Sequence, residues 1–496
     1  MCGFVISAQT EQNNNKSLNG VGSDILARGP DGLRKKVVQL SGLNILIEFS
    51  HLLITQPKSY QPLESDQYIL VLNGEIYNHR ELADKVGRGT SSINDTQAFL
   101  SHIVDYGLEH TLQKTNGMYS GILIYKDTGR CVAFTDHVGK KPLLMWNSNA
   151  GWHIGTGIDT NYLDRSSSLQ VLSPGIYEIE LESGRVKLLA PHQASPACNT
   201  HFGELLLRAV SARIPAGLPF AVALSGGLDS SILAYIIEKQ LCLTPNYFVV
   251  GEQLPDGVIS LMSHLGISSK RIRLIRPSSC KNLKALISET CSVVKSYNPS
   301  IVSNGMATML LTKAIHDAGY RVLLGGEGAD EFFCGYQAMY NGKHCPEGMR
   351  LSLVADLHFT ELRRLDLISS HHAVEARCPF LDYRVTQRAL SIEAKHHCNS
   401  HSNTGKILLR NLYQGLLPDT IIDAHKEPFD ITSGLQKKVI DTLKVFGQSE
   451  REALKTEFIK VMGKSAIFNH SYFSEYPVFD EMIDQRDKKY KVELHE

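Results

Sequence analysis

The stretch Ser225-Gly226-Gly227-Leu228-Asp229-Ser230-Ser231 lies between an apolar run at 220–224 and a helix-like run at 230–239. A glycine-rich loop that leads from a strand into a helix turns backbone N–H groups and the positive end of the helix dipole toward an anion. Asp229 would repel a phosphate unless it bound a divalent cation. The loop lacks the Gly-Lys-Ser/Thr ending of the Walker motif. It therefore predicts a site for pyrophosphate and Mg²⁺, and the alternative is a glycine-rich turn that caps a helix.

The residues after this loop alternate between strand-like runs, at 247–250, 272–275 and 321–324, and helix-like runs, at 257–265, 281–295 and 305–318. Such alternation predicts a parallel α/β sheet, whose ligands bind at the carboxyl ends of the strands. The segment Leu324-Gly325-Gly326-Glu327-Gly328-Ala329-Asp330-Glu331 follows the last of these strands. We expect its carboxylates at the same sheet edge, where they would complete a metal site or act as a base. The chain from there to about residue 445 is predicted to be largely helical.

The first 190 residues have a different pattern. Period-two runs at 43–49, 68–72, 121–125 and 176–181 are separated by turns such as Gly29-Pro30-Asp31-Gly32. This pattern predicts a mostly antiparallel sheet, with helices such as 96–106 on its faces. Residues 186–200 lose the periodicity and predict a linker. We therefore divide the chain into a domain at 1–190, a linker at 191–200, a second domain at 201–449, and an unassigned tail at 450–496.

Cys2 stands directly after Met1. Removal of Met1 would place an α-amino group, with a pKa of about 7.7–8, beside the thiol. Such an amine can serve as the general base for its own nucleophile. Gly3 leaves room for a substrate. The alternative is a cysteine with no role in chemistry.

Asn73 and Gly74 follow the strand-like run at 69–72. A side-chain amide and a backbone N–H at a strand end can form an oxyanion hole, and the alternative is an Asn-Gly hairpin turn. Asp95 would hold a substrate amine or cap the helix that follows it.

The composition excludes several classes of protein. Of 496 residues, 51 are Lys or Arg and 51 are Asp or Glu, and this zero net charge argues against a nucleic-acid partner. No apolar stretch is long enough to span a membrane, and the first residues do not form a secretory signal. The ten cysteines include no Cys-x-x-Cys pair, so we expect reduced thiols in a cytoplasmic protein.

Five motifs of the first domain occur in the order found in the glutaminase domain of class II glutamine amidotransferases, which this part of the chain resembles. They are Cys2-Gly3, Arg28-Gly29-Pro30-Asp31, Asn73-Gly74-Glu75-Ile76-Tyr77-Asn78, Asn116-Gly117-Met118-Tyr119 and Asp136-His137-x-Gly139-x-x-Pro142-Leu143. The resemblance implies an N-terminal nucleophile fold, an αββα sandwich, with Cys2 as nucleophile and an oxyanion hole at Asn73 and Gly74. It implies glutamine binding by His51, Asn73, Glu75 and Asp95. Two arginines of the family are replaced here, by His51 and Thr135.

The loop at 225–231 resembles the PP-loop of ATP pyrophosphatases. With Val374-Glu375-Ala376-Arg377 and Gly405-Lys406 further on, the chain from residue 2 to about 430 resembles glutamine-hydrolysing asparagine synthetases. The resemblance implies ATP, Mg²⁺ held through Asp229 and Asp330, Glu327 as base toward ammonia, and Lys406 as an electrostatic clamp on phosphate. The ATP contacts that it implies are Leu224, Ser225, Gly226, Gly227, Asp229, Ser230, Val250, Gly325 and Gly326. The chain departs from the family at Gly325 and Leu254, which replace serines, and at Ala373, which replaces a glycine.

We therefore predict an enzyme that releases ammonia from glutamine and transfers it to an adenylylated carboxylate, that of aspartate before others. One alternative is the same chemistry on another carboxylate, including intramolecular cyclisation of the β-lactam synthetase type, whose members lack the N-terminal cysteine. A tRNA-modifying PP-loop enzyme is disfavoured by the zero net charge. A catalytically weak regulator stays open because of His51 and Thr135. The predicted partners are small molecules, with no nucleic acid and no membrane, and the sequence leaves a homodimer open.

The stretch His396-His397-Cys398-x-x-His401 contains residue types that bind metals. Because its surroundings are polar and rich in Ser and Asn, we predict a solvated loop there rather than a metal site.

Overall fold

The structure is a computed structural model that describes residues 2–10, 23–40, 42–54, 58–87, 93–148, 151–158, 168–192, 200–342, 345–425, 433–443, 448–463 and 471–474. The chain forms two compact units. Unit 1 consists of Met1–Pro196, Leu357–Glu375 and Ser465–Tyr472, and unit 2 of Ala197–Asp356, Ala376–Lys464 and Phe473–Glu496. Met1, most of the predicted linker and most of the predicted tail lie outside the described residues.

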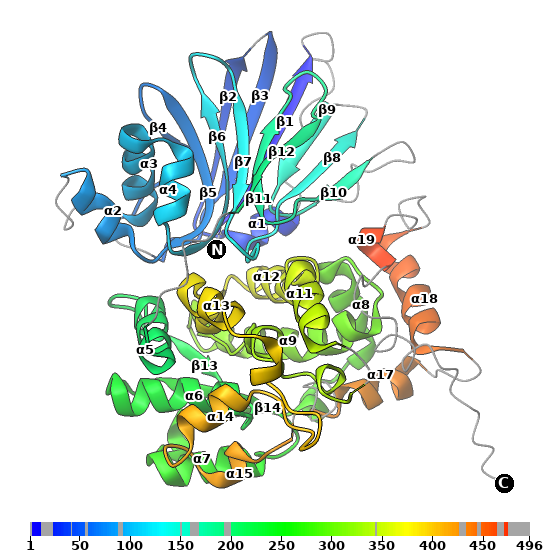
Figure 1. Cartoon of the computed structure of the whole chain (residues 1–496). Coiled ribbons are helices and arrows are strands. Elements are labelled where there is room, and N and C mark those ends of the chain that lie inside the picture. Colours follow the sequence, from blue (N-terminus) through cyan, green and yellow to red (C-terminus); the bar gives the residue numbers. More distant parts are fainter. Residues whose placement is uncertain are drawn as a thin grey trace. The chain divides into compact units, whose positions relative to one another are not determined.

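Unit 1 contains two six-stranded antiparallel sheets, as the alternating sequence pattern predicts (Figure 1). The first has the order β10 (Leu169–Val171), β8 (Leu144–Ser148), β9 (Gly151–Gly155), β1 (Gly3–Thr10), β3 (Leu43–Ser50), β2 (Leu33–Leu40). The second has the order β12 (Val186–Pro191), β11 (Gly175–Ile179), β7 (Cys131–Thr135), β6 (Gly117–Tyr125), β5 (Tyr68–Ile76), β4 (Leu63–Glu64).

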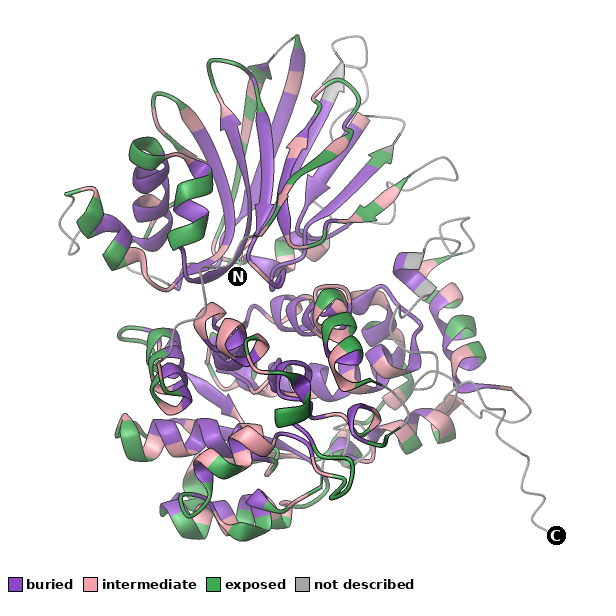
Figure 2. Ribbon diagram, in the orientation of Figure 1, coloured by how far each residue is buried: buried purple, intermediate pink, exposed green. Residues whose placement is uncertain are grey.

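One apolar core joins the two sheets face to face. It includes Phe4 and Ile47 from the first sheet and Val71 and Ile122 from the second, all fully buried. Figure 2 shows that the strands of unit 1 consist largely of buried residues. Because side chains alternate between the faces of a strand, Phe4, Ile6 and Ala8 of β1 and Ile69 and Val71 of β5 enter this core. Burying one such side chain stabilises the fold by about 1.5–3 kcal/mol.

Helices lie on both sides of these sheets. A second core, with Leu72 and Phe99 among its buried residues, packs α2 (His79–Lys85), α3 (Asp95–Tyr106) and α4 (Leu108–Lys114) on the second sheet. The short helix α1 (Ser23–Arg28) lies against β1 and β3, where the Ser50 hydroxyl donates to the carbonyl of Ile25 at 2.5 Å. The predicted αββα sandwich is therefore confirmed.

The segment Leu357–Glu375 carries α12 (Glu361–His371) and is part of unit 1. Sequence analysis placed this segment in the second domain. It lies close to elements of unit 1 that are far away in the sequence, such as α1, and periodicity does not show such proximity.

Unit 2 is built around a five-stranded sheet with the order β15 (Ile272–Ile275), β14 (Asn246–Val250), β13 (Ala221–Ala223), β16 (Val322–Leu324), β17 (Glu375–Arg377). The pairs β15·β14, β14·β13 and β13·β16 are parallel, which confirms the predicted α/β domain. The helices between these strands are α6 (Leu228–Tyr235), continued by the π-helix η3 (Ile236–Gln240), then α7 (Asp256–Leu265), α8 (Leu283–Val294) and α9 (Pro299–Asp317). Two 3₁₀ turns, η4 (Ser269–Arg271) and η5 (Pro277–Ser279), flank β15.

The rest of unit 2 is helical, as predicted. Its elements are α5 (Phe202–Arg213), α10 (Ala329–Phe332), η6 (Gln337–Met339), α11 (Pro346–Asp356), η7 (Pro379–Leu381), α13 (Tyr383–Leu390), η8 (Ala394–His396), α14 (Ile407–Tyr413), α15 (Asp419–Ile422), α17 (Leu435–Leu443) and α18 (Glu450–Met462). A last short helix, α19, spans Ser471–Ser474. None of the helices in the described part of the chain is long and apolar enough to cross a membrane.

Helix α18 belongs to the core of unit 2, although the sequence left residues 450–496 unassigned. Glu457 accepts a hydrogen bond from Ser288 of α8 at 2.6 Å, and Glu450 accepts one from Ser303 of α9 at 3.1 Å. Both glutamates are buried. The charged composition of this stretch concealed its packed face.

Candidate functional sites

Cys2 is held by its backbone on both sides. Its N–H donates to Asn73 Oδ1 at 3.0 Å, and its carbonyl accepts from Arg28 Nε at 3.0 Å. Its sulfur lies 3.9 Å from the carbonyl oxygen of Leu52. Burial raises the pKa of the Cys2 thiol, so a base is needed to form the thiolate.

Asn73 presents an unpaired donor beside Cys2. It is fully buried in β5, opposite Ser120, and its Nδ2 has no hydrogen-bond partner among the described residues. Leaving a buried amide unpaired costs about 1–3 kcal/mol, which a ligand oxygen at this position would offset. The predicted oxyanion donor thus lies next to the predicted nucleophile.

Gly74 is also part of β5, opposite Tyr119, so the alternative of an Asn-Gly hairpin turn is wrong. Its φ is +148°, and a Cβ there would overlap the carbonyl oxygen of Met118. Only glycine fits this close approach of two strands.

Asp95 and Glu75 are buried on neighbouring elements. Asn94, not Asp95, caps α3, because its side chain accepts from the N–H of Gln97 at 2.9 Å. Asp95 Oδ2 accepts from the N–H of Ile76 at 3.1 Å, and burial raises the pKa of its carboxyl group. Glu75 lies on the same face of β5 as Asn73, because side chains alternate along a strand.

His51, which sequence analysis placed among the glutamine ligands, uses both ring nitrogens on the backbone. Nδ1 lies 3.1 Å from the Gly32 carbonyl, and Nε2 accepts from the N–H of Gln61 at 2.8 Å. Burial lowers the pKa of this ring, which favours the neutral form. A neutral ring with both nitrogens engaged offers no donor to a carboxylate, so these contacts do not support the predicted role of His51 as a glutamine ligand.

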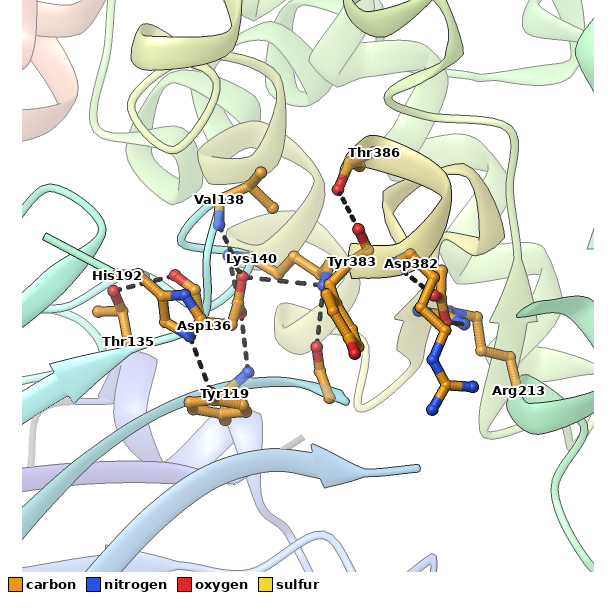
Figure 3. A network of polar contacts seen from close by, with 12 residues as sticks. Tyr119, Thr135, Asp136, Val138, Lys140, His192, Arg213, Asp382, Tyr383 and Thr386 are labelled. Carbon is orange, nitrogen blue, oxygen red and sulfur yellow. Dashed lines mark hydrogen bonds and ion pairs between the residues drawn. The ribbon is translucent and has the colours of Figure 1, made fainter. Parts of the chain in front are cut away.

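Thr135, where the family has an arginine, is buried and supports the neighbouring loop. Its hydroxyl accepts from the N–H of Gly175 at 3.1 Å. Beside it, Asp136 accepts from the N–H groups of Tyr119 and Val138 at 2.9 and 3.1 Å (Figure 3). Through its contact with Tyr119, the first residue of the motif at 136–143 therefore fixes the start of β6.

The predicted phosphate loop of unit 2 is closed by hydroxyl groups. Ser230 Oγ accepts from the N–H of Ser225 and donates to the carbonyl of Gly227, each at 3.2 Å. Gly226 has a φ of +80°, and a Cβ there would lie 2.8 Å from the nitrogen of Val258 in α7. The loop follows β13 and leads into α6, at the carboxyl edge of the parallel sheet, as predicted.

Other predicted ATP residues lie at the same edge. Leu224 follows β13 and donates its N–H to the carbonyl of Phe248 at 3.0 Å, and Val250 ends β14. Gly326 follows β16, and a Cβ there would lie 3.0 Å from the Cβ of Asp229. The second loop therefore lies directly against the first.

Asp229 and Asp330 converge on Lys406. Lys406 Nζ lies 2.6 Å from Asp229 Oδ2 and 2.6 Å from Asp330 Oδ1. A Cβ at Gly335 would overlap both Asp330 Oδ1 and Lys406 Cε, so glycine is required there. The buried Asp229 Oδ1 has no hydrogen-bond partner among the described residues. A pair of carboxylates, with this oxygen of Asp229 available, provides the hard oxygen ligands that Mg²⁺ prefers.

Gly325 gives the Glu327 carboxylate room, because a Cβ at 325 would overlap Glu327 Oε2. The serine of the family would displace this carboxylate. Residue 325 is therefore in direct contact with the predicted base.

The stretch at 396–401 is only in part the solvated loop that we predicted, because His396 and residues 399–401 are exposed but the two residues between them are not. His397 is fully buried with Nε2 3.1 Å from the Ala389 carbonyl, and Cys398 is buried as well. No cluster of three or more metal-ligating residues occurs in the part of the chain that the structure describes.

Asp366 of α12 is a candidate functional residue that no motif in the sequence indicates. It is buried, and it lies within 3.0 Å of two cations, Arg28 and Lys141. The arginine is part of a motif that the sequence shows, but nothing in the sequence connects it to an aspartate so far along the chain.

Comparison with protein families identifies the class of each half. Residues 1–197 match the glutamine amidotransferase domain, and residues 201–353 and 341–475 match asparagine synthase. The chain therefore belongs to the asparagine synthase family and is a glutamine amidotransferase with a ligase half. Its family match extends through α18, well into the stretch that sequence analysis left unassigned.

Individual asparagine synthetases are similar to the chain over most of its length. The chain is 25% identical to a probable glutamine-hydrolysing asparagine synthetase of Acanthamoeba polyphaga mimivirus, over 81% of this chain and 80% of the relative. It is 26% identical to asparagine synthetase B of Escherichia coli, over 83% of this chain and 81% of the relative. It is 28% identical to asparagine synthetase 2 of rice, Oryza sativa, over 84% of this chain and 74% of the relative.

Proposed function

We propose that the protein makes asparagine from aspartate, with ATP as the energy source and glutamine as the nitrogen donor. The observation that carries this proposal is the contact between Cys2 and Asn73, in which the amide of Asn73 orients the backbone of Cys2 and keeps Nδ2 free for an oxyanion. The cluster of Asp229, Asp330 and Lys406 supports the second half-reaction. We also propose that the reaction takes place in the cytoplasm.

In the first half-reaction the thiol of Cys2 attacks the side-chain amide carbon of glutamine. Once Met1 is removed, the α-amine of Cys2 takes the thiol proton and passes it to the leaving ammonia. Asn73 Nδ2 and the Gly74 N–H stabilise the tetrahedral oxyanion. Asp95 and Glu75 are proposed to bind the charged amine of the substrate, and water then releases glutamate.

In the second half-reaction the carboxylate of aspartate attacks the α-phosphate of ATP and displaces pyrophosphate. The loop at 225–231 holds the phosphates on its N–H groups and hydroxyls, and Leu224, Val250, Gly325 and Gly326 line the nucleotide site. Lys406 stabilises the negative charge of the phosphates. Ammonia then attacks the acyl-adenylate, AMP leaves, and Glu327 takes the proton that ammonia loses.

Asp229 and Asp330 are the residues that would hold Mg²⁺, which neutralises phosphate charge when bound. Asp229 Oδ1 is the oxygen that the protein leaves free for such an ion. Lys406 would then move from the two carboxylates toward phosphate.

The test is ATP–pyrophosphate exchange with a panel of carboxylates. We expect exchange that depends on aspartate and on Mg²⁺, and asparagine formation once ammonia is added. Background exchange with aspartate, and strong exchange with another carboxylate, would contradict the proposed acceptor.

A second candidate is the same chemistry on another acceptor, and the observation that favours it is Gly325. With glycine at 325, the Glu327 carboxylate lies against residue 325. A serine there would displace this carboxylate, and the acceptor would then contact a differently shaped surface. The exchange panel distinguishes the two candidates directly.

A further inference from the structure

Asp366 of α12 is buried between two cations of unit 1. Its Oδ2 lies 2.7 Å from Arg28 Nη2, and its Oδ1 lies 3.0 Å from Lys141 Nζ. All three side chains are at most 3% exposed. Because each carboxylate oxygen has its own cation, the carboxylate cannot rotate without breaking a buried ion pair.

Arg28 transmits this constraint to Cys2. Its Nε donates to the Cys2 carbonyl at 3.0 Å, while Asp366 holds the other end of the same guanidinium. A planar guanidinium with both ends bound has a fixed orientation. The Cys2 carbonyl, to which this guanidinium donates, is therefore fixed as well.

This anchor becomes more important once Cys2 is the first residue. Loss of Met1 removes the covalent link on the N-terminal side, so Cys2 is then fixed by Asn73 at its amine, by Arg28 at its carbonyl, and by the start of β1. A nucleophile misplaced by about 1 Å can lose about 10²-fold in rate.

We propose that Asp366 is a positioning residue for glutamine hydrolysis, which it supports by fixing Arg28 and, through Arg28, the backbone of Cys2. This inference rests on the proposed function of Cys2. Asp366 lies outside the part of the chain that matches the amidotransferase domain and inside the part that matches asparagine synthase. The glutaminase site is therefore completed by a residue that the synthetase half of the sequence supplies.

The first experiment compares full-length Asp366→Asn with Glu361→Gln. Glu361 lies on the same helix and forms a partly buried ion pair with Arg364 at 2.6 Å, so its variant controls for a charge and an ion pair lost from α12. For Asp366→Asn we expect kcat for glutamine hydrolysis to fall by about tenfold or more, with KM changed less than about threefold. Ammonia-dependent synthesis should persist in both variants, and Glu361→Gln should hydrolyse glutamine like the parent. An unchanged kcat in Asp366→Asn would overturn the inference.

A double-mutant cycle separates positioning from a loss of folding. If Asp366 acts through Arg28, then adding Asp366→Asn to Arg28→Lys should reduce kcat further by less than about twofold. If kcat of the double variant instead falls by the product of the two factors measured for the single variants, Asp366 acts independently of Arg28, and the inference is overturned. The Asp366→Glu variant should recover part of the lost kcat.

Alkylation of Cys2 by iodoacetamide gives a readout that does not need glutamine. The thiolate displaces iodide from the reagent, and mass spectrometry of the N-terminal peptide gives the rate. We expect this rate to change at least about threefold in Asp366→Asn and not in Glu361→Gln. Absence of glutamine hydrolysis in the parent would refute the proposed function alone, whereas equal alkylation rates in the parent and Asp366→Asn would refute the positioning role.

Discussion

The two candidate sites are built in opposite ways. At Cys2 the oxyanion donors are neutral groups of β5, namely Asn73 Nδ2, which has no partner among the described residues, and the Gly74 N–H. The buried carboxylates of Glu75 and Asp95 belong to β5 and α3. The site at Asp229 is made of charges at the N-terminal ends of short helices beside a parallel sheet, where Lys406 bridges two carboxylates. A neutral donor pair suits an amide carbonyl that becomes an oxyanion, and a charged cluster suits phosphate and a cation. The difference means that each half-reaction should be removable without the other.

The strongest test of this separation is Cys2→Ala. We expect glutamine-dependent synthesis to fall by about 10³-fold or more, because no nucleophile remains, while ammonia-dependent synthesis is retained. The readout is asparagine formed with either nitrogen source. Cys345→Ala, at an exposed cysteine of unit 2, serves as the control and should change neither activity. Equal loss of both activities would contradict the separation.

Asp330→Asn should give the reverse pattern. Removing one of the two carboxylates should lower ATP–pyrophosphate exchange by about 10²–10³-fold with either nitrogen source, while glutamine hydrolysis continues. The assay should be repeated over a range of Mg²⁺ concentrations, since a weakened cation site is partly restored by more cation. Exchange at the parent's rate would remove Asp330 from the proposed site.

Asn73→Asp sharpens the description of the first site. This variant keeps an acceptor for the Cys2 nitrogen but replaces the unpaired donor by a second oxygen. We expect kcat for glutamine hydrolysis to fall by about 10²-fold, with a smaller change in KM. Asn73→Ala removes the acceptor too and should lose at least as much. If Asn73→Asp hydrolyses glutamine normally, Asn73 only orients Cys2.

The smallest expected effect is on stability at acid pH, because each unit contains a buried histidine whose pKa is strongly lowered. Burial lowers the pKa of His153 in unit 1 and of His397 in unit 2 to about 4. The unfolded chain takes up these protons near pH 6.5, so stability is complete above that pH and falls as the pH drops toward 4. Each residue should contribute up to about 3 kcal/mol of this loss.

Urea unfolding at about pH 7 and about pH 5 measures this loss. A His397→Gln variant should show a shallower dependence on pH in the transition of unit 2 and leave that of unit 1 unchanged. An equal dependence in the variant would show that His397 is not the group responsible.

The sequence predicted the second site better than the first. The strand, loop and helix at 220–240 are contiguous, and parallel strands place their carboxyl ends at one edge, so Asp229 and Asp330 could be brought together by reasoning alone. In unit 1 the partners of Cys2 come from distant strands and a helix. Asn73 was predicted from its residue type and resemblance, but its place inside β5 was not, because an Asn-Gly pair is typical of a turn.

Side-chain roles that depend on tertiary contacts were the least predictable. His51 occupies a position that the resemblance assigns to a ligand, yet two backbone contacts use both of its nitrogens. Asn94 caps α3, although the sequence suggested Asp95 as one possible cap of this helix. Asp366 carried no signal, since a buried aspartate in a helix is recognised only when its cations are seen.

The most direct test of the central claim follows nitrogen between the two sites. The protein is incubated with aspartate, ATP, Mg²⁺ and glutamine labelled with ¹⁵N in its side-chain amide. We predict that the label appears in the side-chain amide of asparagine, with glutamate, AMP and pyrophosphate formed in equal amounts. Label found only in free ammonia, or ATP consumption that does not depend on aspartate, would contradict the proposal that the two sites serve one reaction.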